Sequence, residues 1–150
     1  MKKTAVVFLV LILLAVTLTG CQKNAVSSEA EHLTKLEDYV ASAKKQSDTL
    51  KSSLENDALT QSDMNQKAQE LDELWEAALN HVLDEAKHIL PEDEWTKLTD
   101  QQNAWSKEKE NSVTAAGKEL EGGSLYVLTV GMESARITEE RVYELYEMLK

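Results

Sequence analysis

Four side chains that could bind a metal ion lie within one short stretch of the chain. They are His81, Asp84, Glu85 and His88, and on a helix their spacing places all four on one face. Imidazole and carboxylate groups are ligands that Zn²⁺ accepts. However, the spacing differs from the His-Glu-x-x-His pattern of zinc peptidases, and solvated helix faces often have this composition. We therefore expect no metal cofactor, and a zinc site on this face is a hypothesis for the structure to test.

Patterns typical of catalysis are absent from the sequence. Serines are frequent, but none stands in a Gly-x-Ser-x-Gly turn of the kind that exposes a nucleophile. No glycine-rich loop for binding phosphate is present. With 27 acidic residues, paired carboxylates occur throughout and single out no acid and nucleophile of a glycosidase. The sequence therefore predicts a protein that is not an enzyme and that needs no cofactor.

The chain's single cysteine, Cys21, follows a segment typical of exported proteins. Lys2 and Lys3 precede an apolar run over residues 5–16, which is shorter than the roughly 20 residues that a membrane-spanning helix needs. The residues directly before the cysteine are Leu18, Thr19 and Gly20. This order resembles the lipobox of bacterial lipoproteins. The resemblance implies cleavage after Gly20 and transfer of a diacylglycerol group to the Cys21 sulfur.

Residues 1–20 are accordingly predicted to be a cleaved signal peptide. The mature chain would be lipid-anchored to the cell membrane on its extracytoplasmic side, where an unmodified lone cysteine would be a free thiol in an oxidising space. Each buried methylene contributes about 0.8 kcal/mol, so two or three acyl chains anchor stably. Residues 21–28 are expected to be a short flexible tether that reaches about 15 Å.

The mature chain is strongly acidic. Removing residues 1–20 takes away two lysines and no acidic residue, which leaves 14 basic against 27 acidic residues and a formal charge of −13. Such a chain is repelled by nucleic acid and by anionic lipid, so neither is an expected partner. Its charge favours encounter with a basic protein instead.

The mature chain is predicted to be all-α. It has few glycines and one proline, so the turn signals of a strand-rich fold are missing. Apolar residues at spacings of three and four indicate four helices: residues 29–56, residues 62–90, Pro91 to the Gly122-Gly123 pair, and Ser124 to residue 149. Ser28 is expected to cap the first helix, and a break near Thr138 is possible in the last.

Matched lengths and short connections favour an antiparallel bundle of three to four long helices. The alternative is a three-helix domain over residues 62–150, with residues 29–55 as a separate amphipathic stalk or an oligomerising helix. The seam of that first helix consists of Leu33, Leu36, Val40, Ala43, Ser47, Leu50 and Leu54. Trp75, Trp95 and Trp105 also fall on apolar stripes, so we expect them to pack in the core.

Three sequence elements in the second half carry a family resemblance. They are Leu71-Asp72-x-x-Trp75-x-x-x-Leu79, Gln101-Gln102-x-Ala104-Trp105-x-Lys107-x-Lys109 and Thr138-x-x-Arg141-x-x-x-Leu145, with Gly122-Gly123-Ser124 before the third. Their order and spacing over residues 62–149 resemble the LprI-type lysozyme-inhibitor domain. The resemblance implies a small helical domain of secreted and lipid-anchored bacterial proteins. Lys109 and Arg141 are expected to bridge helices rather than to recognise a ligand.

The resemblance and the charge together suggest lysozyme, a basic protein, as partner. Inhibition would require a loop that enters the glycan cleft, and the candidate partner-binding loop comprises Glu119, Glu121, Gly122 and Gly123. The alternative is a non-catalytic structural or adaptor lipoprotein of the cell envelope, which would pair through residues 29–55, for instance as a homo-oligomer.

Overall fold

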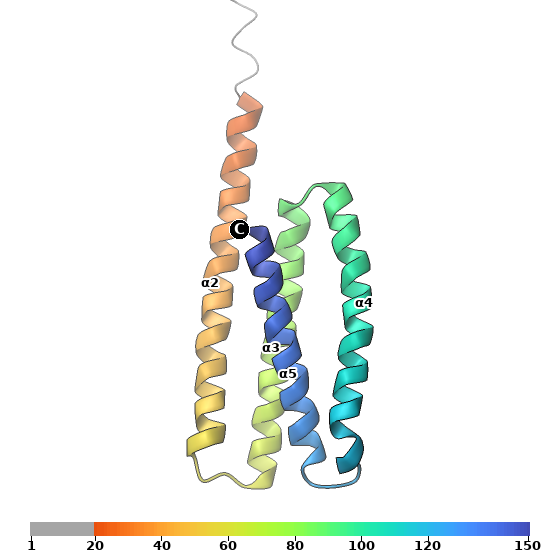
Figure 1. Cartoon of the computed structure of the whole chain (residues 1–150). Coiled ribbons are helices and arrows are strands. Elements are labelled where there is room, and N and C mark those ends of the chain that lie inside the picture. The colour runs from red at the N-terminus through yellow and green to blue at the C-terminus, as the bar shows by residue number, and fades with distance from the viewer. Residues whose placement is uncertain (1–19) are drawn as a thin grey trace, which may run out of the picture.

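The computed structural model describes the chain from residue 20 to residue 150, with side chains from residue 28 onward, and this part is built from helices (Figure 1). The elements are α2 (Gly20–Asn56), α3 (Gln61–Ile89), α4 (Glu92–Gly117), the 3₁₀ helix η1 (Lys118–Leu120) and α5 (Tyr126–Leu149). The predicted all-α fold is confirmed. Most of the predicted signal peptide, including Leu18 and Thr19, lies outside the described residues, whereas Gly20 and Cys21 lie in the first turn of α2.

The boundaries of α3 follow from local chemistry. The Thr60 hydroxyl accepts a hydrogen bond from the Asp63 N–H at 3.2 Å, and the Asp63 carboxylate accepts one from the Thr60 N–H at 3.0 Å. This reciprocal cap stabilises the start of the helix, and the hydrogen bonds from Thr60 lower the pKa of Asp63. At the other end, Pro91 is the N-cap of α4 and separates the two helices, as predicted.

The predicted flexible tether is wrong. Residues 21–28 are helical, and α2 runs without interruption from Gly20 past Ser28, which therefore caps nothing. After Gly20 the segment contains neither glycine nor proline, so the backbone meets no helix breaker before Asn56.

Two further predictions fail around α5. The helix α4 ends at Gly117, ahead of the Gly122-Gly123 pair, and Ser124 does not cap α5, since its N-cap is Leu125 without a side-chain hydrogen bond. The possible break near Thr138 does not occur. The Thr138 hydroxyl donates to the Ser134 carbonyl at 2.8 Å, so its polar group is satisfied inside a continuous helix.

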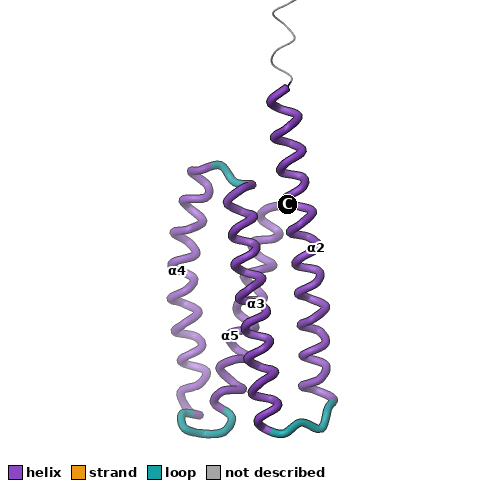
Figure 2. The backbone as a smooth tube through the Cα atoms, turned by 180° about the vertical axis from the view of Figure 1, so that it is seen from behind, coloured by secondary structure: helices purple, strands orange, loops and turns teal. Residues whose placement is uncertain are grey.

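The four long helices form a flattened bundle with α3 and α5 at its centre. Consecutive helices are antiparallel, so α3 and α5 run in the same direction, and they share the most extensive packing in the molecule. On opposite sides of this pair, α2 packs on α3 and α4 packs on α5 (Figure 2). Gly131 allows the central helices to approach closely, because a Cβ there would lie 3.2 Å from the Ala68 Cβ.

The core is concentrated where α2, α3 and α5 meet. Trp75 is fully buried there, its indole N–H donates to the Ser47 hydroxyl at 3.2 Å, and its ring lies 5.6 Å from that of Tyr143. The other buried apolar side chains of this region include Leu36, Val40, Ala43, Leu71, Ala78, Val82, Ala135, Val142 and Leu145. The seam predicted for the first helix is thus confirmed as a core face.

The helix α4 contributes much less to the core. Its buried residues are Leu98 and Gly117, while Trp95 and Trp105 are half-buried and pack against the edge of the cluster. The helix therefore depends on contacts other than apolar burial for its position.

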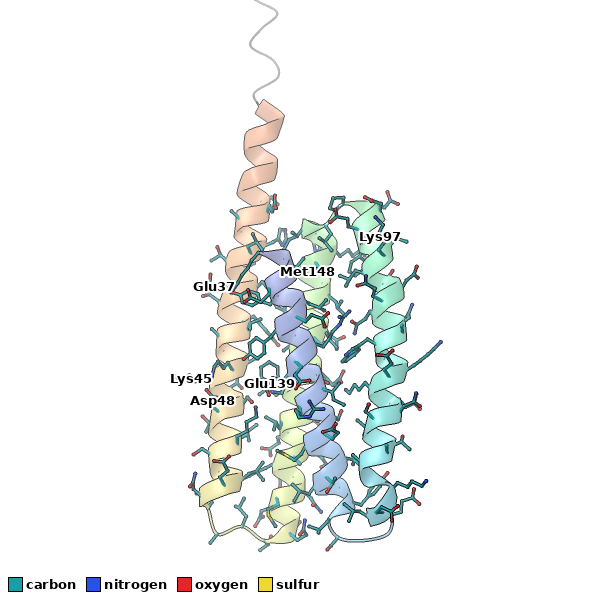
Figure 3. All side chains as sticks on the ribbon, in the orientation of Figure 1. Glu37, Lys45, Asp48, Lys97, Glu139 and Met148 are labelled. Atoms are coloured by element: carbon teal, nitrogen blue, oxygen red, sulfur yellow. The ribbon has the colours of Figure 1, made fainter. Side chains whose placement is uncertain are left out.

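The outer face of α2 is polar. Glu37, Lys45 and Asp48 are exposed and point away from the bundle (Figure 3). The hydrophobic seam that suggested pairing through residues 29–55 is occupied by α3 and α5 of the same chain. Within residues 20–150, no helix combines the length and apolar character needed to span a membrane.

Candidate functional site

The four candidate metal ligands on α3 do not converge. His81 stacks on the Tyr39 ring at 4.0 Å, while Glu85 contacts His32 Nδ1 and His88 stacks on the His32 ring at 5.0 Å. Histidine and carboxylate side chains thus pack α3 against α2. Among the described side chains, no group of three or more histidine, cysteine or acidic residues is placed to hold a metal ion.

Residues of the three sequence elements meet instead where α3, α4 and α5 come together. Lys109 of α4 forms an ion pair with Glu76 of α3, and the Thr138 hydroxyl oxygen of α5 lies 3.2 Å from the same Glu76 oxygen. The Lys109 side chain is 14% exposed and the Glu76 side chain is 42% exposed, so the lysine is largely shielded from solvent while the carboxylate stays partly accessible. One carboxylate therefore connects all three helices.

Arg141 makes a second bridge one turn further along α5. Its Nε donates to Gln102 Oε1 of α4 at 3.0 Å, and its Nη1 pairs with Glu144 at 2.8 Å. The guanidinium lies 5.9 Å from the Trp105 ring centre and Lys109 Nζ lies 5.8 Å from the same ring, both within the range of cation–π attraction. Arg141 is 6% exposed. The prediction that Lys109 and Arg141 bridge helices is confirmed.

These bridges position α4, which buries few apolar side chains of its own. They join it to α3 and α5 through its middle turns, and thereby set where its last turn lies relative to α5. The cluster therefore supports the turn that follows α4. Its lysine and arginine are largely buried, whereas Glu76 and Glu144 remain accessible to solvent, and Arg141 Nη2 has no hydrogen-bond partner among the described residues.

The end of α4 is held against α5 at Gly117. A Cβ at this position would lie 2.6 Å from Val130 Cγ1 and 2.7 Å from the Tyr126 ring, so only glycine lets the two helices come this close. The sequence pattern did not single out Gly117. The signal that could have found it is the run of small residues Ala115-Ala116-Gly117 at the end of a helix.

Residues 118–123, which we name the distal turn, connect α4 to α5. The turn is ordered by backbone hydrogen bonds from Gly123 N–H to the Leu120 carbonyl (2.9 Å) and from Tyr126 N–H to the Gly123 carbonyl (3.2 Å). Gly122 has a φ of +76°, a conformation that glycine adopts without strain. No atom lies within 4 Å of a Cβ built there, so this point of the backbone faces open space.

All four residues of the candidate partner-binding loop are exposed and share this turn. Glu119, Glu121, Gly122 and Gly123 are solvent-accessible, as is Lys118, while Leu120 is half-buried. The turn lies at the end of the bundle opposite Gly20, together with the connection between α2 and α3 (Figure 1). The structure therefore brings the predicted loop residues together on a protruding, ordered turn.

Comparison with known proteins identifies the family. The family model described as "Lysozyme inhibitor LprI" matches residues 52–145, which is more than half of the chain. The chain belongs to the LprI lysozyme inhibitor family. No curated protein and no solved structure matches it.

The matched segment of this LprI-family protein includes the bridging cluster and the distal turn. It begins at residue 52, inside the last turns of α2, whereas the resemblance read from the sequence began at residue 62. Most of α2 lies outside the match, yet it covers the buried face of α3. The core of the family domain in this chain is thus completed by α2, of which the family model matches only the last residues.

Proposed function

We propose that this protein is a non-catalytic lysozyme inhibitor that is anchored to the extracytoplasmic face of the cell membrane through a lipid on Cys21. The observation that carries the proposal is the family match over residues 52–145. The anchor rests on the lipobox pattern of Leu18, Thr19, Gly20 and Cys21. Together they describe a protein that protects peptidoglycan close to the membrane.

The geometry of α2 supports this arrangement. The helix has 37 residues, which corresponds to about 55 Å at 1.5 Å per residue. Cys21 lies at one end of this helix, and the distal turn lies at the other end of the molecule (Figure 1). A lipid on Cys21 would leave the distal turn directed away from the membrane, toward the glycan layer that lysozyme attacks.

The charge of the far end suits a basic partner. Exposed carboxylates at this end are Glu55 in the last turn of α2, Asp57 on the connection to α3, and Glu119 and Glu121 of the distal turn. Lysozymes of the common type are strongly basic, so a mature chain of formal charge −13 would attract them at long range.

Lipidation is tested by changing the attachment residue. Cys21→Ser is expected to release the protein from the membrane fraction and to abolish incorporation of labelled fatty acid, because serine supplies no thiol for the diacylglycerol. Ser27→Ala serves as the control, since it leaves the lipobox intact, and it should remain membrane-bound. Equal membrane retention of both variants would contradict the anchor.

Inhibition is tested with a soluble protein of residues 22–150 and a common-type lysozyme at about 0.15 M salt, where attraction between exposed charges is screened beyond about 8 Å. Submicromolar binding with loss of lytic activity is expected. Binding that disappears with salt and leaves lysis unchanged would contradict the proposal.

A matched pair of variants locates the contact. Glu119→Lys/Glu121→Lys reverses two charges on the distal turn, whereas Glu108→Lys/Glu110→Lys makes the same change on the exposed side of α4. Inhibition should fall much further in the first double variant than in the second. Equal losses would mean that total charge, and not the distal turn, determines inhibition.

A further inference from the structure

An acidic inhibitor faces an electrostatic difficulty at the lysozyme active site. Glycosidases of this type act with a pair of carboxyl groups that flank the scissile bond. A loop whose carboxylates approached that pair would place like charges together in a partly desolvated cleft, which opposes binding. The group that reaches the catalytic centre should therefore be a hydrogen-bond donor, preferably a cation.

The distal turn contains one such group, Lys118. It is the only basic residue of the turn, whose sequence is Lys-Glu-Leu-Glu-Gly-Gly. Its side chain is exposed and makes no ion pair with any described residue, although Glu119 and Glu121 lie nearby in the sequence. Among the lysines of the preceding α4, Lys97 pairs with Asp93 and Lys109 pairs with Glu76, whereas Lys107, like Lys118, makes no ion pair with a described residue.

The backbone that carries Lys118 is held in place before any partner binds. Its own N–H donates to the Ala115 carbonyl, and the preceding Gly117 is pressed against Val130 and Tyr126. Little ordering of the backbone is then required on binding, so a contact made by the Lys118 side chain loses less entropy than one made from a mobile loop.

We propose that Lys118 enters the glycan cleft of lysozyme and that its ammonium group pairs with a catalytic carboxylate. This inference rests on the proposed inhibitor function. Glu119 and Glu121 then contact the basic rim of the cleft. The two kinds of charge have separate kinetic roles: the rim carboxylates accelerate association, and the Lys118 ion pair slows dissociation and blocks the reacting groups.

The test compares Lys118→Met with Lys107→Met, which removes an exposed lysine of α4 away from the distal turn. Both variants keep the aliphatic part of the side chain, and circular dichroism checks their helix content. Lys118→Met is expected to weaken binding by about 30-fold or more, mainly through faster dissociation, as for loss of one partner of a buried charge pair. Lys107→Met should change the dissociation rate by less than about 3-fold, and Lys118→Arg should recover most of the inhibition.

A second measurement identifies the group that Lys118 contacts. A lysozyme in which the catalytic glutamate is replaced by glutamine should bind the wild-type inhibitor more weakly, but should bind Lys118→Met with unchanged affinity, which is the signature of a direct pair in a double-mutant cycle. A wild-type protein that does not inhibit lysozyme would overturn the proposed function and this inference together. A wild-type protein that inhibits, with Lys118→Met inhibiting equally well, would overturn this inference alone.

Discussion

Replacing Trp75 with alanine is expected to lower the free energy of unfolding by about 3–5 kcal/mol. Trp75 is fully buried between α2, α3 and α5, and its ring packs against Tyr143. Alanine would leave a large cavity at the point where these helices meet, and the Ser47 hydroxyl, which is also buried, would lose its hydrogen-bond donor. Much of the stability of a typical small domain, about 5–15 kcal/mol, depends on this one side chain.

Urea denaturation of residues 22–150, followed by circular dichroism, measures this loss without relying on tryptophan fluorescence. Trp95→Ala is the matched control. Because Trp95 is only half-buried at the start of α4, this variant should lower the free energy of unfolding clearly less than Trp75→Ala does. The loss of unfolding free energy in Trp75→Phe should lie between those of Trp75→Ala and Trp95→Ala, because phenylalanine retains most of the packing but lacks the indole N–H. Similar losses for Trp75→Ala and Trp95→Ala would contradict the burial that distinguishes these residues.

Local signals in the sequence were sufficient to predict the four long helices and some of the residues at which they begin and end. The start of α3 is set by contacts between Thr60 and Asp63, and its end by Pro91, so both depend only on neighbouring residues. The buried face of α2 follows from the spacing of Leu36, Val40 and Ala43. Such features are determined within a few residues of the chain, and for this reason a single sequence reveals them.

The arrangement of the helices could not be obtained in this way. Periodicity shows that a helix has an apolar face, but not which helix covers it, and the parallel pairing of α3 with α5 depends on the meeting of Gly131 with Ala68 across the fold. Similarly, Trp75 and Trp105 lie on comparable stripes, yet one is fully buried and the other half-buried, because α4 lies at the edge of the bundle.

The candidate site was foreseen in the same uneven way. The glycines and glutamates of the distal turn were recognised as a loop, and Lys109 and Arg141 as bridges between helices, from residue type and position alone. Gly117 was missed because its importance comes from two residues of another helix, Val130 and Tyr126. His81 and His88 illustrate the opposite case. Their shared face on α3 suggested a metal site, but the sequence could not show that the rings of His32 and Tyr39 on α2 stack against them.

Deleting α2 is expected to abolish cooperative folding, although most of this helix lies outside the family match. In a protein of residues 57–150, the buried face of α3 around Trp75 would be exposed to water. Leu36 and Val40 are nearly inaccessible in the intact chain, and each fully buried side chain of this size contributes about 1.5–3 kcal/mol. The lost contacts, which also include those of Leu33 and Leu50, are comparable with the whole stability of a small domain.

Thermal unfolding and the dispersion of amide signals in NMR spectra of residues 57–150 test this expectation. A peptide of residues 28–56 added in trans should restore a cooperative transition, because it supplies the missing core face. The same peptide with Leu36→Ser and Val40→Ser is the control, and it should fail. If residues 57–150 alone melt cooperatively near the temperature of the longer protein, then the family domain folds as three helices and α2 is an appendage that only carries the proposed anchor. A folded domain that requires α2 would instead couple the anchored end of the molecule rigidly to the distal turn, since one continuous helix would then serve as both stalk and core.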